Sequence, residues 1–384
     1  MEKKKKEKKP VNKMTKDMWI TLLGYSATHW IADMCAGAVV MASLIYYGYG
    51  IWEVFILVVL YNFLSFGLQF MFGIMIDKFQ VPREATVFSF LLIGAAYFVF
   101  DNPVLVVLLA GIGDSLYHVG AGSISLNLTP QKALPAGIFV APGGIGLFSG
   151  IIIGKSSTIP LPFEWGSISL NFGPVTMAIL LGLLVISIIF TIYREIPEIN
   201  YKRVNTRPKI KYYDLIIALL LLSVSIRSLY GLTAGFEWKK GFWLPLALVT
   251  GIVTGKAVGG FLADKFGWTK VAVTSLIVAA PLLVFCQSTW YLAILGAMIF
   301  QMTMSVTLVA MSNIFEGRSS TAFGFVASTL IVGASPVYLG AEILKPILRS
   351  QTVMLVVVGI SAISLYTGLR LLRNYFRKGL KINL

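Results

Sequence analysis

Runs of roughly 20 apolar residues recur along the whole chain and restrict its fold more than any other feature. As an α-helix, each run is long enough to cross a hydrocarbon layer about 30 Å thick. The runs are continuous and do not alternate with a period of two, so they predict helices and not the strands of a membrane barrel. Only 13% of the residues are charged, whereas a soluble protein carries roughly 25%. We therefore predict an all-α polytopic protein whose partner over most of its surface is the lipid bilayer.

The apolar runs predict about twelve transmembrane helices. Their expected ranges are 18–45, 52–76, 84–100, 103–127, 134–154, 171–193, 212–235, 242–263, 270–287, 289–312, 321–342 and 351–373. The two cysteines, Cys35 and Cys286, lie far apart within these segments. They therefore predict neither a disulfide framework nor a metal knuckle.

The formal net charge of +15 is concentrated in a few segments. Eight lysines lie in the first sixteen residues, six basic residues lie in 194–211, and five follow position 369. With the N-terminus inside, cytoplasmic segments collect 25 of the 32 basic residues and outer loops collect five. Cytoplasmic loops of membrane proteins carry such an excess. This distribution predicts a multi-pass protein of the cell membrane with both termini in the cytoplasm, and it argues against nucleic acid as a partner.

The segment 194–211 is polar, basic and contains two prolines, a composition typical of a linker between domains. It divides the chain into a basic tail (1–17), a six-helix bundle (18–193), the linker (194–211) and a second six-helix bundle with a basic tail (212–384). An internal repeat supports this division. The pattern GxxxDKF occurs at Gly73–Phe79, after the second predicted helix, and at Gly260–Phe266, after the eighth.

On these residues the chain resembles the major facilitator superfamily of transporters. That family has a motif of the form GxxxD(R/K)xGRx(R/K) between helices 2 and 3 and again between helices 8 and 9. The second copy, GGFLADKFGWTK, fits it well. The first copy, GIMIDKFQVPR, has Gln80 in place of the loop glycine and adds Pro82. The resemblance implies two pseudo-symmetric six-helix bundles, transport by alternating access, no cofactor and a monomer.

Within that family the chain is most similar to the fosmidomycin-resistance type. The similar stretches are Thr28–Met34, Gly111–His118, Phe139–Gly146 and Glu316–Arg318. Asp114 is not part of the subgroup pattern. The resemblance suggests a phosphonate-like anion as substrate.

Only two histidines occur in the chain, and each has an aspartate four residues away inside an apolar segment. His29 and Asp33 share one face of the first predicted helix, and Asp114 and His118 share one face of the fourth. Because these helices run in opposite directions, all four side chains are expected near one depth in the membrane. A mid-membrane aspartate costs about 2.5–3.5 kcal/mol on insertion scales, so such groups face a cavity or one another. The pattern predicts a proton or substrate site.

Two alternatives remain open for these four residues. They could form a hydrogen-bonded clamp between two helices. They could also bind a metal, because two imidazoles and two carboxylates are a reasonable ligand set for Zn²⁺. In that case the ion would be cargo and not a resident cofactor.

Two basic residues lie within predicted helices of the second half. Arg227 is expected near the depth of the two aspartates, where a lone cation could bind an anionic substrate or form a salt bridge between the halves. Lys256 is closer to the cytoplasmic end and could either face the cavity or extend to the interface.

Asp77 and Asp264 end the second and eighth predicted helices, where a carboxylate can accept hydrogen bonds from the exposed amides at the start of a neighbouring helix. The family resemblance implies a gating role for both aspartates, and for Arg83, Glu316 and Arg318 in the matching motifs.

A strip of small residues runs along the fifth predicted helix. It comprises Pro142, Gly143, Gly144, Gly146, Gly150 and Gly154, and the last three have the spacing GxxxGxxxG. Such spacing allows close helix contact, and a proline within a helix can kink it. The strip resembles the helix-5 glycine motif of drug/proton antiporters, which favours efflux, although tight packing explains it equally well.

These observations predict a secondary transporter and not an enzyme: a proton-coupled exporter of a small anionic or amphipathic compound. An importer of a metabolite or a divalent metal through the same fold is the alternative. An intramembrane zinc hydrolase is a remote third candidate, since such enzymes need typically three metal ligands and an activated water.

Overall fold

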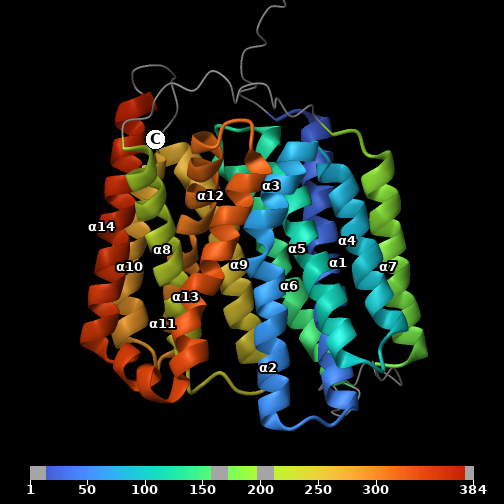
Figure 1. The fold of residues 1–384 in the computed structure, drawn as a ribbon. Helices are drawn as coiled ribbons and strands as arrows, with labels where there is room; N and C mark the ends of the chain where they lie inside the picture. The colour runs from blue at the N-terminus through green and yellow to red at the C-terminus, as the bar shows by residue number, and fades with distance from the viewer. Residues whose placement is uncertain (1–13, 157–171, 197–211, 377–384) are drawn as a thin grey trace, which may run out of the picture.

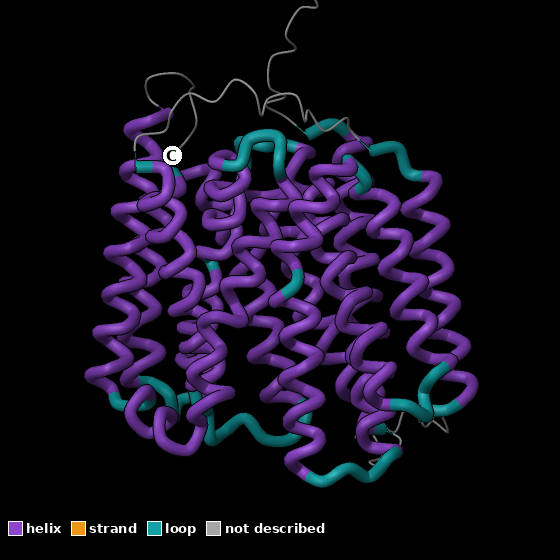
Figure 2. The backbone as a smooth tube through the Cα atoms, in the orientation of Figure 1, coloured by secondary structure: helices purple, strands orange, loops and turns teal. Residues whose placement is uncertain are grey.

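The computed structural model describes residues 14–156, 172–196 and 212–376, and these residues form long helices joined by short loops (Figures 1 and 2). In chain order the helices are α1 (Lys16–Tyr46), α2 (Ile51–Asn62), the π-helical turn η1 (Phe63–Gly67), α3 (Gln69–Phe79), α4 (Pro82–Phe98), α5 (Pro103–Leu128), α6 (Ala133–Lys155), α7 (Pro174–Tyr193), α8 (Tyr213–Thr233), α9 (Trp243–Phe266), α10 (Trp268–Phe285), α11 (Trp290–Gln301), α12 (Thr303–Ile314), α13 (Ser319–Leu348) and α14 (Gln351–Phe376).

Each of the twelve predicted ranges contains a helix, with ends that shift by a few residues. Eleven helical segments of the described chain are long and apolar enough to cross a membrane. The remaining one, α4, has 17 residues. Two of the predicted helices are interrupted. The second consists of α2, η1 and α3 in succession, and the tenth is divided into α11 and α12 at Met302.

The first helix begins and the last helix ends at the same side of the bundle, which we call the terminal face (Figure 1). This agrees with an even number of crossings. The compartment that this face adjoins stays a prediction. Residues 1–13, 197–211 and 377–384, which include most of the predicted tails and linker, lie outside the described residues.

The contacts between helices show how each set of six helices packs and where the two sets meet. In the first half α1 packs along α6 and α4 along α5, while in the second half α8 packs against α13 and α14. The main contacts between the halves join α6 to α9 and α3 to α13. The helices α1, α5, α6, α8, α9, α12 and α13 therefore surround the region between the halves.

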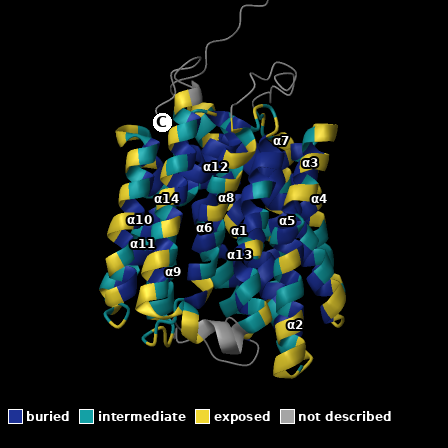
Figure 3. Ribbon diagram, turned by 60° about the vertical axis from the view of Figure 1, so that its left-hand side comes forward, coloured by how far each residue is buried: buried dark blue, intermediate teal, exposed yellow. Residues whose placement is uncertain are grey.

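The outer surface is apolar. Large hydrophobic side chains on the outer faces of the helices are exposed, as the yellow strips in Figure 3 show. On α7, for example, Ile179, Val185 and Ile186 are each more than half exposed. An apolar exterior of this extent suits a hydrocarbon environment and not water.

Candidate functional site

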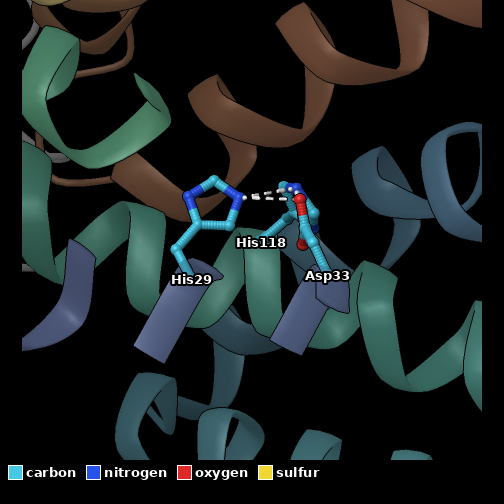
Figure 4. Close-up of side chains that lie close together, drawn as sticks. All are labelled: His29, Asp33 and His118. Carbon is cyan, nitrogen blue, oxygen red and sulfur yellow. Dashed lines mark hydrogen bonds and ion pairs between the residues drawn. The ribbon is translucent and has the colours of Figure 1, made fainter. Parts of the chain in front are cut away.

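The two histidines of the chain meet at one point between α1 and α5. The Nε2 atom of His29 lies 3.0 Å from the Nε2 atom of His118. The Asp33 carboxylate lies beside both rings, with Oδ2 3.5 Å from His29 Nε2 and Oδ1 3.8 Å from His118 Nε2. Figure 4 shows the three side chains converging. All three residues are buried, with 2–9% of their surface exposed. We call them the central triad.

The other nitrogen of each ring is committed to the backbone. Nδ1 of His29 lies 2.7 Å from the carbonyl oxygen of Phe139, and Nδ1 of His118 lies 2.8 Å from the carbonyl oxygen of Asp114. A carbonyl oxygen only accepts hydrogen bonds, so each Nδ1 carries a hydrogen and donates it. In the neutral form of both rings, the two facing Nε2 atoms would therefore both be bare lone pairs. At 3.0 Å that arrangement is repulsive, and a proton or another cation between the two atoms relieves it.

Asp114 does not join the triad, although the sequence placed it at the same depth. Its Oδ2 atom accepts a hydrogen bond from the hydroxyl of Ser65, in η1. Its Oδ1 atom lies 3.6 Å from Nδ1 of His118. Asp114 thus lies behind His118, and its carboxyl also contacts that of Asp33. A single π-helical turn within a longer helix is frequent at functional sites.

The strip on α6 supports the triad through Pro142 and Gly143. Proline has no amide hydrogen, so the carbonyl of Ile138 loses its usual helical donor, and the hydroxyl of Ser26 lies 3.3 Å from it. At Gly143, a Cβ atom would collide with Nε2 of His29 and Oδ2 of Asp33. This glycine therefore provides the space that the triad occupies.

The other glycines of the strip serve packing. Gly146, Gly150 and Gly154 lie against the α1 backbone at Trp30, Met34 and Ala38 respectively. Gly144 faces the side chain of Val253 on α9. The strip thus holds α1 and α6 together, and its interpretation as an efflux motif stays a prediction.

Two cations line the site from the second half, of which Arg227 is buried and Lys256 is half-buried. Arg227 on α8 donates to two hydroxyls, with Nη1 2.6 Å from Thr303 Oγ1 and Nη2 3.2 Å from Thr307 Oγ1. Lys256 on α9 has its Nζ atom 3.4 Å from the carbonyl oxygen of Val140. Within the described part of the chain, no carboxylate lies within salt-bridge distance of either cation.

One cavity joins the triad to these cations. It has a volume of about 200 Å³ and lies between the halves. His29, Asp33 and His118 line it from the first half, while Arg227 and Lys256 line it from the second. Apolar side chains from η1, α6, α8, α12 and α13 complete the wall. A cavity with a few polar groups in an apolar wall is the usual form of a small-molecule site.

At the terminal face, the two copies of GxxxDKF make equivalent contacts between the halves. The Asp77 carboxylate accepts hydrogen bonds from the backbone amides of Ser320 and Thr321, at 3.2 and 2.7 Å. These amides begin α13. The Asp264 carboxylate accepts from the amides of Ala133 and Leu134, which begin α6, at 2.8 and 2.9 Å.

Both contacts combine a negative charge with the positive end of a helix dipole. The glycine four residues earlier in each copy allows the approach, because a Cβ on Gly73 would meet the backbone of Ser320 and one on Gly260 would meet that of Ala133. The terminal face is therefore closed by two symmetric contacts between the halves. Whether they gate transport stays a prediction.

Arg83, another gating candidate, makes a contact within the first half. Arg83 donates from Nη2 to the carbonyl oxygen of Arg194 at 2.6 Å, which ties α4 to the end of α7 within the first half. Glu316 and Arg318 lie exposed in the loop between α12 and α13. Their predicted gating role stays a prediction.

Several residues of the site had no signal in the sequence. Ser65 binds Asp114, and Thr303 and Thr307 bind Arg227, but hydroxyl residues are too common in membrane helices to single these out. Phe139 contributes through its backbone carbonyl and by stacking on His29, with ring centroids 4.7 Å apart. A further strip, Gly251, Gly255 and Gly259 on α9, was readable as GxxxGxxxG and packs against α11 and Met302.

No protein-family model and no curated protein sequence matches the chain. Solved structures do match its fold. A variant of the Escherichia coli fucose:proton symporter FucP aligns with a TM-score of 0.64 at 11% identity, over 94% of this chain and 99% of the other. A structure of the Major Facilitator Superfamily transporter FucP in the outward conformation aligns with a TM-score of 0.60 at 12% identity, over 90% and 98%. The chain therefore has the all-α, polytopic fold of the major facilitator superfamily.

Proposed function

We propose that the chain is a secondary active transporter that moves a small anion and a proton by alternating access. The observation that carries this proposal is the cavity between the halves, with the central triad on one wall and Arg227 and Lys256 on the other. The fold supports it, because transporters of this kind bind substrate near the midplane between two repeats.

The proton is assigned to the histidine pair. Both Nδ1 atoms donate to carbonyl oxygens, so one proton between the two Nε2 atoms completes the hydrogen bonding of both rings. Histidine suits this task because its unperturbed pKa is about 6.5, near the pH of the cytoplasm. Asp33 supplies the counter-charge at 3.5 and 3.8 Å.

The anion is assigned to the opposite wall. The charged groups that face the pair are Asp33 on α1, Asp114 on α5, Arg227 on α8 and Lys256 on α9, and their formal charges sum to zero when all are ionised. One shared proton makes the site positive by one charge. A monoanion then neutralises it, so electrostatics favour binding of proton and anion together, which is symport.

Alternating access needs an end that opens and closes. The contacts of Asp77 and Asp264 with the N-termini of α13 and α6 join the halves at the terminal face. In the proposed cycle these contacts break when the halves rock about the cavity, and the opposite end closes.

Export by antiport, the direction predicted from the resemblance to resistance proteins, is the second candidate. The apolar side chains around the cavity favour it, because they suit an amphipathic compound. One solved structure of similar fold is described as a fucose:proton symporter, which supports the first candidate by analogy alone.

The test uses purified protein in liposomes that contain a pH-sensitive dye. Phosphonates including fosmidomycin, sugar phosphates and small carboxylates are added outside, one at a time, without a pH gradient. Symport predicts acidification of the interior as the anion enters, and antiport predicts alkalinisation. Arg227→Gln is expected to abolish anion-driven proton movement, while Lys240→Gln, an exposed residue in the loop before α9, leaves it intact. Anion entry that moves no protons, or that is unaffected by Arg227→Gln, contradicts the proposal.

A further inference from the structure

We propose that the central triad is a binding site for one transition-metal ion of the Zn²⁺ class, held by Nε2 of His29, Nε2 of His118 and the Asp33 carboxylate. These donor atoms all lie within 4.8 Å of one another. The proposal concerns binding only, so it stands whether or not the chain transports an anion. The same two Nε2 lone pairs hold either the shared proton or the ion, so the two occupants compete for the site.

The spacing of the three donors suits zinc. A tetrahedral Zn²⁺ with bonds of 2.0–2.1 Å holds its ligand atoms about 3.3 Å apart. In the triad the two Nε2 atoms are 3.0 Å apart, and each has a different oxygen of Asp33 nearby, Oδ2 at 3.5 Å from His29 and Oδ1 at 3.8 Å from His118. An ion placed between the donors therefore requires the Asp33 carboxylate to turn so that one oxygen faces both nitrogens, from donor separations that are all within 4.8 Å.

The donors are also in the right chemical state. Metal-binding histidines usually donate their other ring hydrogen to a carbonyl or carboxylate, which fixes the ring and leaves the ligating lone pair free. Both rings have that arrangement, through the carbonyl oxygens of Phe139 and Asp114. The two lone pairs point at the same space.

Asp33 provides a second, independent indication of a ligand. It is 92% buried, since 8% of its surface is exposed, and its Oδ1 atom has no hydrogen-bond partner among the described residues. A buried carboxylate oxygen without a partner is costly, and either a proton shared with the neighbouring Asp114 carboxyl or a bound cation would satisfy it. A cation between the triad atoms satisfies it directly.

Two neutral imidazoles and one carboxylate form a three-ligand set of the type that leaves a fourth position open. The triad lines the same cavity as Arg227 and Lys256. The open position is therefore available to water or to an anion that these cations also contact. The nearby carboxylate of Asp114 offsets part of the positive charge that the ion adds.

The experiment measures metal binding to purified full-length protein that carries an affinity tag without histidine, since the chain itself has only two. The protein is freed of metal with chelator and then equilibrated with micromolar Zn²⁺. We expect one bound ion per chain by elemental analysis. Co²⁺ in place of Zn²⁺ should give the intense visible absorption of a four-coordinate site.

Six variants test the assignment: four should bind the ion more weakly and two should keep it. His29→Gln, His118→Gln and Asp33→Asn each remove a donor and should weaken binding by more than about tenfold. Gly143→Ala keeps every donor but adds a methyl group against His29 Nε2 and Asp33 Oδ2, so it should weaken binding as well. Gly182→Ala is its matched control, because nothing lies within 4 Å of a Cβ there. Asp114→Asn should keep the ion, since its backbone carbonyl still orients His118.

Each variant must elute as the same species as the parent in size-exclusion chromatography, so that lost binding is not lost folding. The proposal is overturned if the parent binds no Zn²⁺, or if the His29→Gln and His118→Gln variants bind it as the parent does. Neither result depends on the liposome assay. Failure of metal binding therefore leaves the proposed transport function untouched, and failure of transport leaves this site untouched.

Discussion

At the scale of single residues, two serines near Asp114 differ in what their hydroxyls do. Ser65, in the π-helical turn η1, donates a hydrogen bond to the Asp114 carboxylate. Ser115 follows Asp114 directly in the chain and is equally buried, but its Oγ atom has no partner among the described residues. Replacing each serine by alanine therefore separates the effect of losing a hydrogen bond from the effect of losing the volume of a hydroxyl.

We expect Ser65→Ala to lower the free energy of unfolding by about 1–3 kcal/mol, because it leaves a buried carboxylate oxygen without its donor. Ser115→Ala should cost less than about 0.5 kcal/mol, since it removes an unsatisfied group. Equilibrium unfolding in mixed micelles measures both. Equal losses would mean that the Ser65 hydroxyl does not stabilise Asp114.

At the scale of elements, the two GxxxDKF segments are each followed by a loop, and the two loops are similar although their sequences differ. Lys78 and Lys265 lie over the rings of Phe79 and Phe266, at 5.5 and 5.2 Å from the centroids. The next residue has a positive φ in both copies, 60° at Gln80 and 99° at Gly267. Gln80 therefore keeps the positive φ of the loop glycine that it replaces, and Pro82 follows as the first residue of α4, where proline is favoured.

The two loops should respond differently to exchange of these residues. Gly267 has φ 99° and ψ 137°, a region that side chains rarely adopt, so Gly267→Gln should destabilise the protein by about 1–3 kcal/mol. Gln80 has φ 60° and ψ 40°, which is left-handed helical and tolerable, so Gln80→Gly should change stability by less than about 1 kcal/mol. Thermal unfolding of the two variants compares them. A larger loss in Gln80→Gly would contradict the backbone account.

At the scale of the whole molecule, the sequence predicted what depends on periodicity and length. The helices follow from apolar runs, and the pairs His29–Asp33 and Asp114–His118 follow from the four-residue spacing. It did not predict that Asp114 lies behind His118. That placement depends on η1, and nothing in Phe63–Gly67 marks a π-helical turn. Nor did it predict the contact of Arg83 with the end of α7, since a residue motif does not specify which helix lies beside it.

Closure of the terminal face gives a prediction for the molecule as a whole. Asn127 on α5 donates to Ser319 at the start of α13, with 2.6 Å between Nδ2 and Oγ. In a background with Cys35 and Cys286 replaced by alanine, cysteines at positions 127 and 319 should be joined by a short bifunctional thiol reagent. The linked halves cannot separate at this face, so liposome transport should fall to background and return on reduction.

Each single-cysteine variant, treated in the same way, is the control and should keep its transport. Full activity of the linked protein, with the link verified by mass spectrometry, would show that this face does not open during the cycle.

The meeting of both histidines at one point has a spectroscopic consequence. Because the chain has no third histidine, nitrogen-15 labelling of this amino acid alone places every labelled imidazole in the cavity. A nuclear magnetic resonance spectrum of the 42.0 kDa protein in lipid would then consist of two ring systems. Their chemical shifts distinguish a bare, protonated or metal-bound nitrogen, and a scalar coupling between the rings reports a hydrogen that both hold. The protonation and metal binding at the centre of a large membrane protein are thus observable in a spectrum with signals from only two residues.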